Sequence, residues 1–204
     1  MTSATKTDKQ RRMDEIRKHA QELAPSACSS RRNIVWGEGP LTVLAAIVGE
    51  APGNTEDRAG RPFVGSSGIL LTQELARVDL IRSDFWITNV VKCRPTKQVE
   101  SRITNRAPTA KEAHAWSGIL MDELKVVEPK IILCAGVLAA RMLLDKNFIM
   151  SQDRGKWFDG PFGTRVIATY HPAYVQRQIG LSNDQVIAEF RSDLQKMKDA
   201  IGKL

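Results

Sequence analysis

Four runs of apolar residues recur along the chain and form its clearest pattern. Within each run the apolar positions are nearly continuous and do not alternate with polar ones. Continuous runs of this length are typical of parallel strands that are buried on both faces of a sheet. The predicted strands cover residues 42–48, 85–91, 130–134 and 165–170.

Segments with helical spacing alternate with these strands. Pro108, Thr109 and Glu112 have the pattern of a helix start with a capping box. The alternation predicts an α/β fold of three layers, α/β/α, with a central, mostly parallel four-stranded sheet. In such folds the ligand crevice lies beyond the carboxyl ends of the strands. The predicted helices cover residues 8–23, 67–78, 109–127, 137–144 and 183–201.

Length and composition limit the class of protein. The chain has 204 residues, of which 42% are hydrophobic and 26% charged, which excludes a disordered chain and a membrane protein. We expect a single domain over residues 1–204, with residues 1–33 as an N-terminal helical flank. We also expect a cytoplasmic protein, because the chain begins without a secretory signal and Cys28, Cys93 and Cys134 do not form a disulfide framework.

Charge and glycine content suggest an anionic partner. The net charge of +7 favours nucleic acid, although a basic, well-solvated surface explains it equally well. Six cations and two carboxylates fall within residues 92–112, a segment suited either to a phosphate backbone or to solvent. The glycine-rich residues 60–68 lead into a predicted helix, where backbone N–H groups can approach a phosphate. Their spacing matches neither a P-loop nor a dinucleotide-binding fingerprint.

Polar side chains of three chemical types follow the predicted strands. The first strand leads into Glu50, the second carries Asn89, and the last leads into His171. Because parallel strands end at one edge of a sheet, we expect these side chains to converge. A histidine at a strand end is often only a structural hydrogen-bonding group, so the convergence carries more weight than any one residue.

Five stretches of the sequence resemble the uracil-DNA glycosylase superfamily, and within it family 4, which typically carries an iron–sulfur cluster. They are GEAPGNTEDRAGRPFVGSSGILL (49–71), WITNVVKCRP (86–95), PKIILCAGVLAARMLL (129–144), RGKW (154–157) and ATYHPAYVQR (168–177). The resemblance covers most of residues 34–177. It implies a monofunctional glycosylase of base excision repair that flips uracil out of DNA and hydrolyses its N-glycosidic bond, leaving an abasic site.

The resemblance also implies catalytic roles. His171 donates a hydrogen bond, as neutral imidazole, to a uracil carbonyl, and Glu50 places negative charge near the sugar and positions the water. Glu56 and Asp57 are alternatives to Glu50 as the residue that positions the water. Glu56 could instead line the pocket or cap the following turn.

Base recognition is implied in the same way. The amide of Asn89 matches the uracil edge because it offers both a donor and an acceptor. Phe63 either stacks on the flipped base or packs in the core. Ala51 stands where other families have Asp or Asn, and Gly53 stands where strict families have a tyrosine that blocks the thymine methyl. A wider pocket that accepts other deaminated bases is therefore a hypothesis.

DNA contacts are expected from three segments. The turn after His171 is expected to enter the minor groove, with Val175 as an apolar wedge and Arg177 on a phosphate. The glycine-rich loop and the cationic segment are expected to contact the backbone. The predicted DNA-binding residues are Gly65, Ser66, Ser67, Lys92, Arg94, Pro172, Tyr174, Val175 and Arg177.

Two departures from the family pattern change the expected chemistry. The counterparts of the four cluster cysteines are Pro25, Cys28, Cys93 and Trp116, so we expect no iron–sulfur cluster, and we expect no other metal or cofactor. A related group that traps uracil-DNA covalently has a histidine where this chain has Asn105, so covalent trapping is not expected.

The expected partner is uracil-containing DNA, bound by a monomer that makes no membrane contact. Two alternatives belong to other classes: a non-catalytic module that binds uracil-DNA or damaged DNA, and a hydrolase of small nucleosides. Loss of turnover in His171→Ala or Glu50→Ala would favour the enzyme, whereas binding without an abasic product would favour the module. Strong, salt-dependent DNA affinity would argue against the nucleoside hydrolase.

Overall fold

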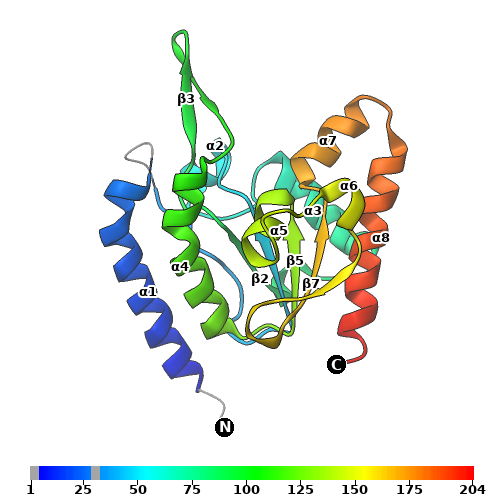
Figure 1. The fold of residues 1–204 in the computed structure, drawn as a ribbon, viewed down its shortest axis with the longest axis horizontal. Coiled ribbons are helices and arrows are strands. Elements are labelled where there is room, and N and C mark those ends of the chain that lie inside the picture. The colour runs from blue at the N-terminus through cyan, green and yellow to red at the C-terminus, as the bar shows by residue number, and fades with distance from the viewer. Residues whose placement is uncertain (1–4, 29–32) are drawn as a thin grey trace.

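The computed structural model of the protein describes residues 5–28 and 33–204 (Figure 1). At its centre is a five-stranded sheet with the strand order β2-β1-β5-β7-β6. The first four of these strands are parallel, and β6 pairs antiparallel with β7 at the edge. The strands are β1 (Ala45–Gly49), β2 (Phe85–Asn89), β5 (Ile131–Ala135), β6 (Trp157–Asp159) and β7 (Arg165–Thr169).

The predicted fold class is confirmed, and each of the four predicted strands is present. The sheet has one strand more than predicted. The additional strand, β6, has only three residues, and none of them is fully buried. It therefore lacks the long apolar run by which the other four strands are recognised.

Helices cover both faces of the sheet. On one face, Met13 of α1 belongs to the same apolar core as Val48, together with α4 and α5. On the other face, Phe190 of α8 shares a core with Ile47, together with α3 and α7. Because successive strand residues point to opposite faces, both alternate sets must be apolar, which explains the continuous runs. The helices are α1 (Lys6–Ala27), α2 (Asn54–Ala59), α3 (Ser66–Arg77), α4 (Ala110–Val127), α5 (Val137–Leu143), α6 (Met150–Asp153), α7 (Pro172–Gly180) and α8 (Asp184–Ile201).

Two regular elements at the carboxyl edge of the sheet differ from the sequence prediction. β3 (Thr96–Val99) and β4 (Arg102–Asn105) form an antiparallel hairpin. In Figure 1 this hairpin projects from the molecule on the side toward which β5 and β7 point. The segment after His171 is the helix α7, with Pro172 in its first turn, and not an open DNA-binding turn.

Cys28 and Cys93 are joined by a disulfide, with their Cα atoms 5.9 Å apart. Cys28 caps the end of α1, and Cys93 lies in the loop that follows β2, so the bond ties the first helix to the carboxyl edge of the sheet. The expectation that the cysteines form no disulfide is therefore wrong for this pair, which 65 residues of sequence separate. Cys134 is a buried free thiol in β5. In the described ranges, no helix has the length and apolar character needed to cross a membrane.

Candidate active site at the carboxyl edge of the sheet

A cavity of 610 Å³ opens where the parallel strands end. Its wall contains Glu50, Asn89 and His171, the three side chains that were expected to converge, together with Phe63. The loop after β1, the first turn of α3, the start of α7 and the base of the β3–β4 hairpin complete the wall. The strand ends therefore place a carboxylate, an amide, an imidazole and an aromatic ring around one space.

Gly49, the last residue of β1, allows Phe63 and Asn89 to approach each other. A Cβ atom at this position would overlap both the Phe63 ring and Oδ1 of Asn89. Asn89 is 2% exposed, and no partner for its side-chain amide is found among the described residues. Because a buried amide without hydrogen bonds is costly, its position in the cavity wall favours a role in binding a polar ligand.

The backbone of Phe63 is held in an unusual conformation. Its φ angle of 52° lies in the left-handed region, which non-glycine residues rarely adopt. Arg82 donates hydrogen bonds to the carbonyls of Phe63 (3.0 Å) and Pro62 (2.7 Å), and Glu38 in turn pairs with Arg82 at 2.8 Å. The Phe63 ring lies 6.0 Å from the His171 ring, with 28° between their planes. Sequence reasoning missed Arg82 and Glu38, because 44 residues separate them.

The hydrogen bonding of His171 fixes its tautomer. His171 caps α7, and its Nδ1 accepts a hydrogen bond from the backbone N–H of Ala173 at 3.1 Å. An accepting nitrogen carries no proton, so the proton of the neutral ring is on Nε2. Burial, with a smaller contribution from the charge of Arg177, lowers the pKa of His171 to about 4, while Glu56 acts in the opposite direction. At neutral pH the ring is therefore an uncharged donor through Nε2.

The end of β7, which leads into His171, is tied to α8 by hydrogen bonds and ion pairs. The Thr169 hydroxyl donates to Oδ2 of Asp193 at 2.9 Å, and Arg154 pairs with the same oxygen at 2.8 Å. Arg154 also pairs with Glu189 at 2.9 Å. Arg154 opens the RGKW stretch, so this motif supports the position of the histidine from outside the cavity.

The three carboxylates that could position the attacking water differ in their surroundings. Glu50 lines the cavity, burial raises its pKa, and the described residues provide no hydrogen-bond partner for its carboxylate. Glu56 also lines the cavity, but its oxygens accept three backbone N–H groups at 2.6–3.1 Å and hold two loops together. Asp57 is buried and is not part of the cavity wall. The donors to Glu56 are Gly53, Val64 and Gly65.

The prediction that Lys92 binds DNA is wrong, because its side chain is completely buried. Its ammonium group pairs with Glu123 at 2.5 Å and donates to the Thr88 hydroxyl and the Asn89 carbonyl. Burial lowers the pKa of Lys92, while Glu123 acts in the opposite direction. Lys92 therefore holds the end of β2, which carries Asn89.

Arg94 is likewise held by partners inside the protein. It is 4% exposed and donates to Oδ1 of Asn105 at 2.6 Å and to Oδ1 of Asn54 at 2.7 Å. Nearby, Arg106 forms two hydrogen bonds of 2.7 Å with Glu112. A count of charges along the chain overestimated the cations available to DNA, because it cannot identify those held by internal partners.

The remaining predicted DNA-binding residues fall into two groups. Val175 and Pro172 are buried in the structure, because the helical backbone of α7 turns them toward the core, so Val175 is not a wedge. The others line the cavity, although the N–H of Gly65 is already donated to Glu56. This second group contains Gly65, Ser66, Ser67, Tyr174 and Arg177, and the predicted pocket residues Ala51 and Gly53 also line the cavity.

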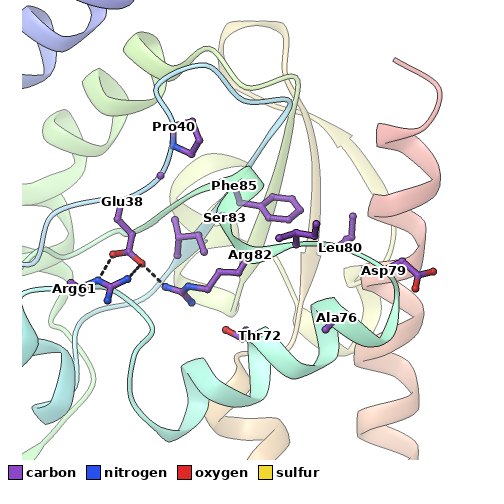
Figure 2. A pocket seen from close by; sticks show the side chains of 13 residues that line it. Glu38, Pro40, Arg61, Thr72, Ala76, Asp79, Leu80, Arg82, Ser83 and Phe85 are labelled. Carbon is purple, nitrogen blue, oxygen red and sulfur yellow. Dashed lines mark hydrogen bonds and ion pairs between the residues drawn. The ribbon is translucent and has the colours of Figure 1, made fainter.

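A larger cavity of 910 Å³ lies elsewhere, beside β2 at the edge of the sheet. Figure 2 shows Glu38 between Arg61 and Arg82 in its wall, with the apolar Phe85 and Leu80 nearby. None of the candidate catalytic residues lines this space. The smaller cavity at the strand ends is therefore the candidate active site.

Comparison with known proteins agrees with this geometry. The family model of the Uracil DNA glycosylase superfamily matches residues 36–195. The chain belongs to this superfamily. It is 37% identical over 175 residues to the type-4 uracil-DNA glycosylase of Thermotoga maritima, covering 85% of this chain and 86% of the relative. It is 39% identical to the type-4 enzyme of Archaeoglobus fulgidus, with 85% of each chain covered, which confirms the resemblance.

The prediction that the protein binds no cofactor is contradicted by these relatives. They are type-4 uracil-DNA glycosylases, which typically carry a 4Fe–4S cluster. The prediction rests on the two cluster cysteines that this chain lacks, and it disagrees with what is typical of these relatives.

The side chains of this chain supply only part of a four-thiolate ligand set. Cys28 and Cys93 are bonded to each other, whereas Trp116 is a buried core residue and Cys134 is buried within the strand β5. The side chain of Pro25 is outside the described structure. Among the described residues, no group of three His, Cys, Asp or Glu side chains could hold a metal. The residues present do not fit the cluster, and no catalytic step below involves it.

Proposed function

We propose that this protein hydrolyses the N-glycosidic bond of uracil in DNA and leaves an abasic site, as the first step of base excision repair. One observation carries the proposal. A neutral imidazole donor, a buried amide without a protein partner and a carboxylate without a protein partner line the same cavity. These are the groups that recognition and removal of a pyrimidine base require.

The first step is extrusion of uracil from the DNA stack into the cavity. There, the Phe63 ring stacks on the base, and the Asn89 amide pairs with its edge. An amide supplies an acceptor for N3–H and a donor for O4, whereas cytosine presents the reverse pattern. Lys92 holds the end of β2 through the Asn89 carbonyl, so the amide is presented from a rigid support.

Bond cleavage develops negative charge on the base and positive charge on the sugar. The Nε2–H of His171 stabilises the departing base by hydrogen bonding to a carbonyl oxygen. Its low pKa suits this role, because a neutral donor stabilises the anion without protonating it. The carboxylate of Glu50 stabilises the sugar cation and orients the attacking water. Glu56 acts on the loop backbone and not on the water.

Gly53 affects the range of bases that the cavity accepts. A Cβ at this position would lie 2.8 Å from the Glu56 carboxylate and 3.4 Å from Nδ2 of Asn105. Gly53 itself sends no side chain into the cavity at the position where strict families carry a tyrosine. We propose that other deaminated bases are also substrates, and the absence of hypoxanthine and xanthine release would contradict this.

We further propose that the protein acts as a monomer on uracil-containing DNA. A single domain that carries the candidate active site is sufficient to bind and bend DNA. Sedimentation of the protein alone and with an oligonucleotide would test the monomer, and a dimer in both samples would contradict it.

A gel assay tests the reaction. The purified protein is incubated with oligonucleotides that contain one uracil, hypoxanthine or thymine, and the products are cleaved with alkali. We expect strand breaks at uracil, and their loss in His171→Asn and Glu50→Gln. His114→Asn is the matched control, because His114 is an exposed residue of α4 outside the cavity. Tight binding to uracil-DNA without breaks would favour a non-catalytic binding module.

A further inference from the structure

The β3–β4 hairpin begins at the cavity and extends beyond it. Asn105, the last residue of β4, lines the cavity. In the hairpin register, Gln98 pairs with Ile103 and Val99 pairs with Arg102. Because side chains alternate along a strand, Ile103 shares a face with Asn105, whereas Val99 and Arg102 lie on the opposite face.

Ile103 is an exposed apolar residue on the face that continues the cavity wall. It is 53% exposed. It lies two positions before Asn105, which corresponds to about 7 Å along a strand. This distance equals about two base steps of a DNA strand. Ile103 therefore lies about two base steps along the hairpin from Asn105 in the cavity wall.

The base of the hairpin is fixed to the rest of the protein. The buried Arg94 connects Asn105 to Asn54 of α2. Arg106, the residue after Asn105, pairs with Glu112 of α4 through two hydrogen bonds and donates to the Thr96 carbonyl. These contacts hold both strands at their bases, so the exposed part of the hairpin has a defined position relative to the cavity.

The exposed cations of the hairpin are complementary to DNA. Lys97 and Arg102 are exposed, and they lie on the face opposite Ile103. The hairpin therefore carries Ile103 on the same face as the cavity residue Asn105, and the two cations on the opposite face together with Val99. Val175, which was expected to fill the space left by the flipped base, is buried and does not serve that purpose.

We propose that the β3–β4 hairpin is a DNA-contacting arm in which Ile103 packs against the bases beside the extruded nucleotide. This rests on the proposed function. The two cations, Lys97 and Arg102, contact phosphates on the outer side of the hairpin. An apolar side chain at this point compensates for the stacking that duplex DNA loses when a base leaves the helix. Single-stranded DNA loses less stacking, so the contact matters more for duplex substrates.

The test compares Ile103→Ser with Val99→Ser, a matched apolar substitution on the other face of the same hairpin. Single-turnover rates are measured on duplex and on single-stranded uracil-DNA. We expect Ile103→Ser to reduce the duplex rate about tenfold, with a much smaller effect on the single strand, consistent with the magnitude of base contacts. Val99→Ser should match the wild type, and Ile103→Leu should retain the duplex rate.

Equal duplex rates for the wild type and Ile103→Ser would overturn the proposal, and so would equal losses in Ile103→Ser and Val99→Ser. Cleavage by the wild type in the same experiment separates this result from failure of the proposed function. A second measurement does not depend on Ile103. Lys97→Gln/Arg102→Gln should lower the slope of log affinity against log salt by about 1.8, since each phosphate contact contributes about 0.9. An unchanged slope would mean that Lys97 and Arg102 do not contact DNA phosphates, which would overturn the proposal.

Discussion

The protonation of His171 can be measured directly, and the structure predicts an unusual result. A free histidine has a pKa of about 6.5, whereas burial lowers the pKa of His171 to about 4. The difference corresponds to about 3 kcal/mol in favour of the neutral ring. At pH 5 we therefore expect about 10% of His171 to be protonated, compared with nearly all of an unperturbed histidine.

The assay is an NMR titration of protein labelled with ¹⁵N at histidine. The His171 signals are identified by their absence in His171→Asn, and their ¹⁵N shifts report the tautomer. We expect the Nε2–H form from pH 8 to pH 5, with Nδ1 accepting from Ala173. Arg177→Gln should raise the pKa of His171, because the charge of Arg177 contributes to lowering it. Lys203→Gln, at the C-terminal end of the chain, is the control.

The same shift predicts how stability depends on pH. Between pH 6.5 and 4 the unfolded chain binds a proton at residue 171 that the folded chain does not, so stability falls as the pH falls. From pH 7 to pH 5 the loss is about 2 kcal/mol. We expect the free energy of unfolding in urea to fall less between pH 7 and pH 5 in His171→Asn than in the wild type, by about 2 kcal/mol. A pKa near 6.5, an Nδ1–H tautomer or the same loss in both proteins would refute the reasoning.

Three further substitutions test the contacts around the cavity. Glu56→Gln removes an acceptor from the backbone N–H groups that Glu56 binds, and we expect a loss of about 1–3 kcal/mol in urea unfolding; unchanged stability would contradict the clamp. Gly49→Ala should retain the fold by circular dichroism but lower kcat/KM for uracil-DNA at least a hundredfold, because the methyl group overlaps two side chains of the cavity; wild-type kinetics would be incompatible with this geometry. Lys92→Met leaves Glu123 buried without its cationic partner and should lower the free energy of unfolding by about 3–5 kcal/mol. The double variant Lys92→Met/Glu123→Leu should recover most of this loss, and equal losses in both variants would argue against the ion pair.

The sheet and its main helices could be predicted because their sequence signals are local. Strands buried on both faces give continuous apolar runs, and the capping box at Thr109 marks the start of α4. β6 and the hairpin are short and partly exposed, so burial leaves no pattern in their sequences. For residues 172–180, the DNA-wedge role that the resemblance implies for Val175 favours an open turn, whereas Pro172 in the first turn is typical of a helix start.

The cavity was predicted in outline, because Glu50, Asn89 and His171 each follow or end a strand. The supporting contacts could not be predicted, since they join residues that are distant in the sequence. Arg82 reaches Phe63 across 19 positions, and Lys92 reaches Glu123 across 31. The sequence alone therefore does not distinguish a cation that is buried against an internal carboxylate, such as Lys92, from one that is available to DNA.

The most direct test of the account is to measure free uracil and abasic sites in the same single-turnover reaction on uracil-containing duplex DNA. We predict that the wild type releases one uracil for each abasic site formed, and that His171→Asn and Glu50→Gln bind the DNA but release uracil far more slowly. Wild-type protein that binds the duplex and produces neither product would contradict the account.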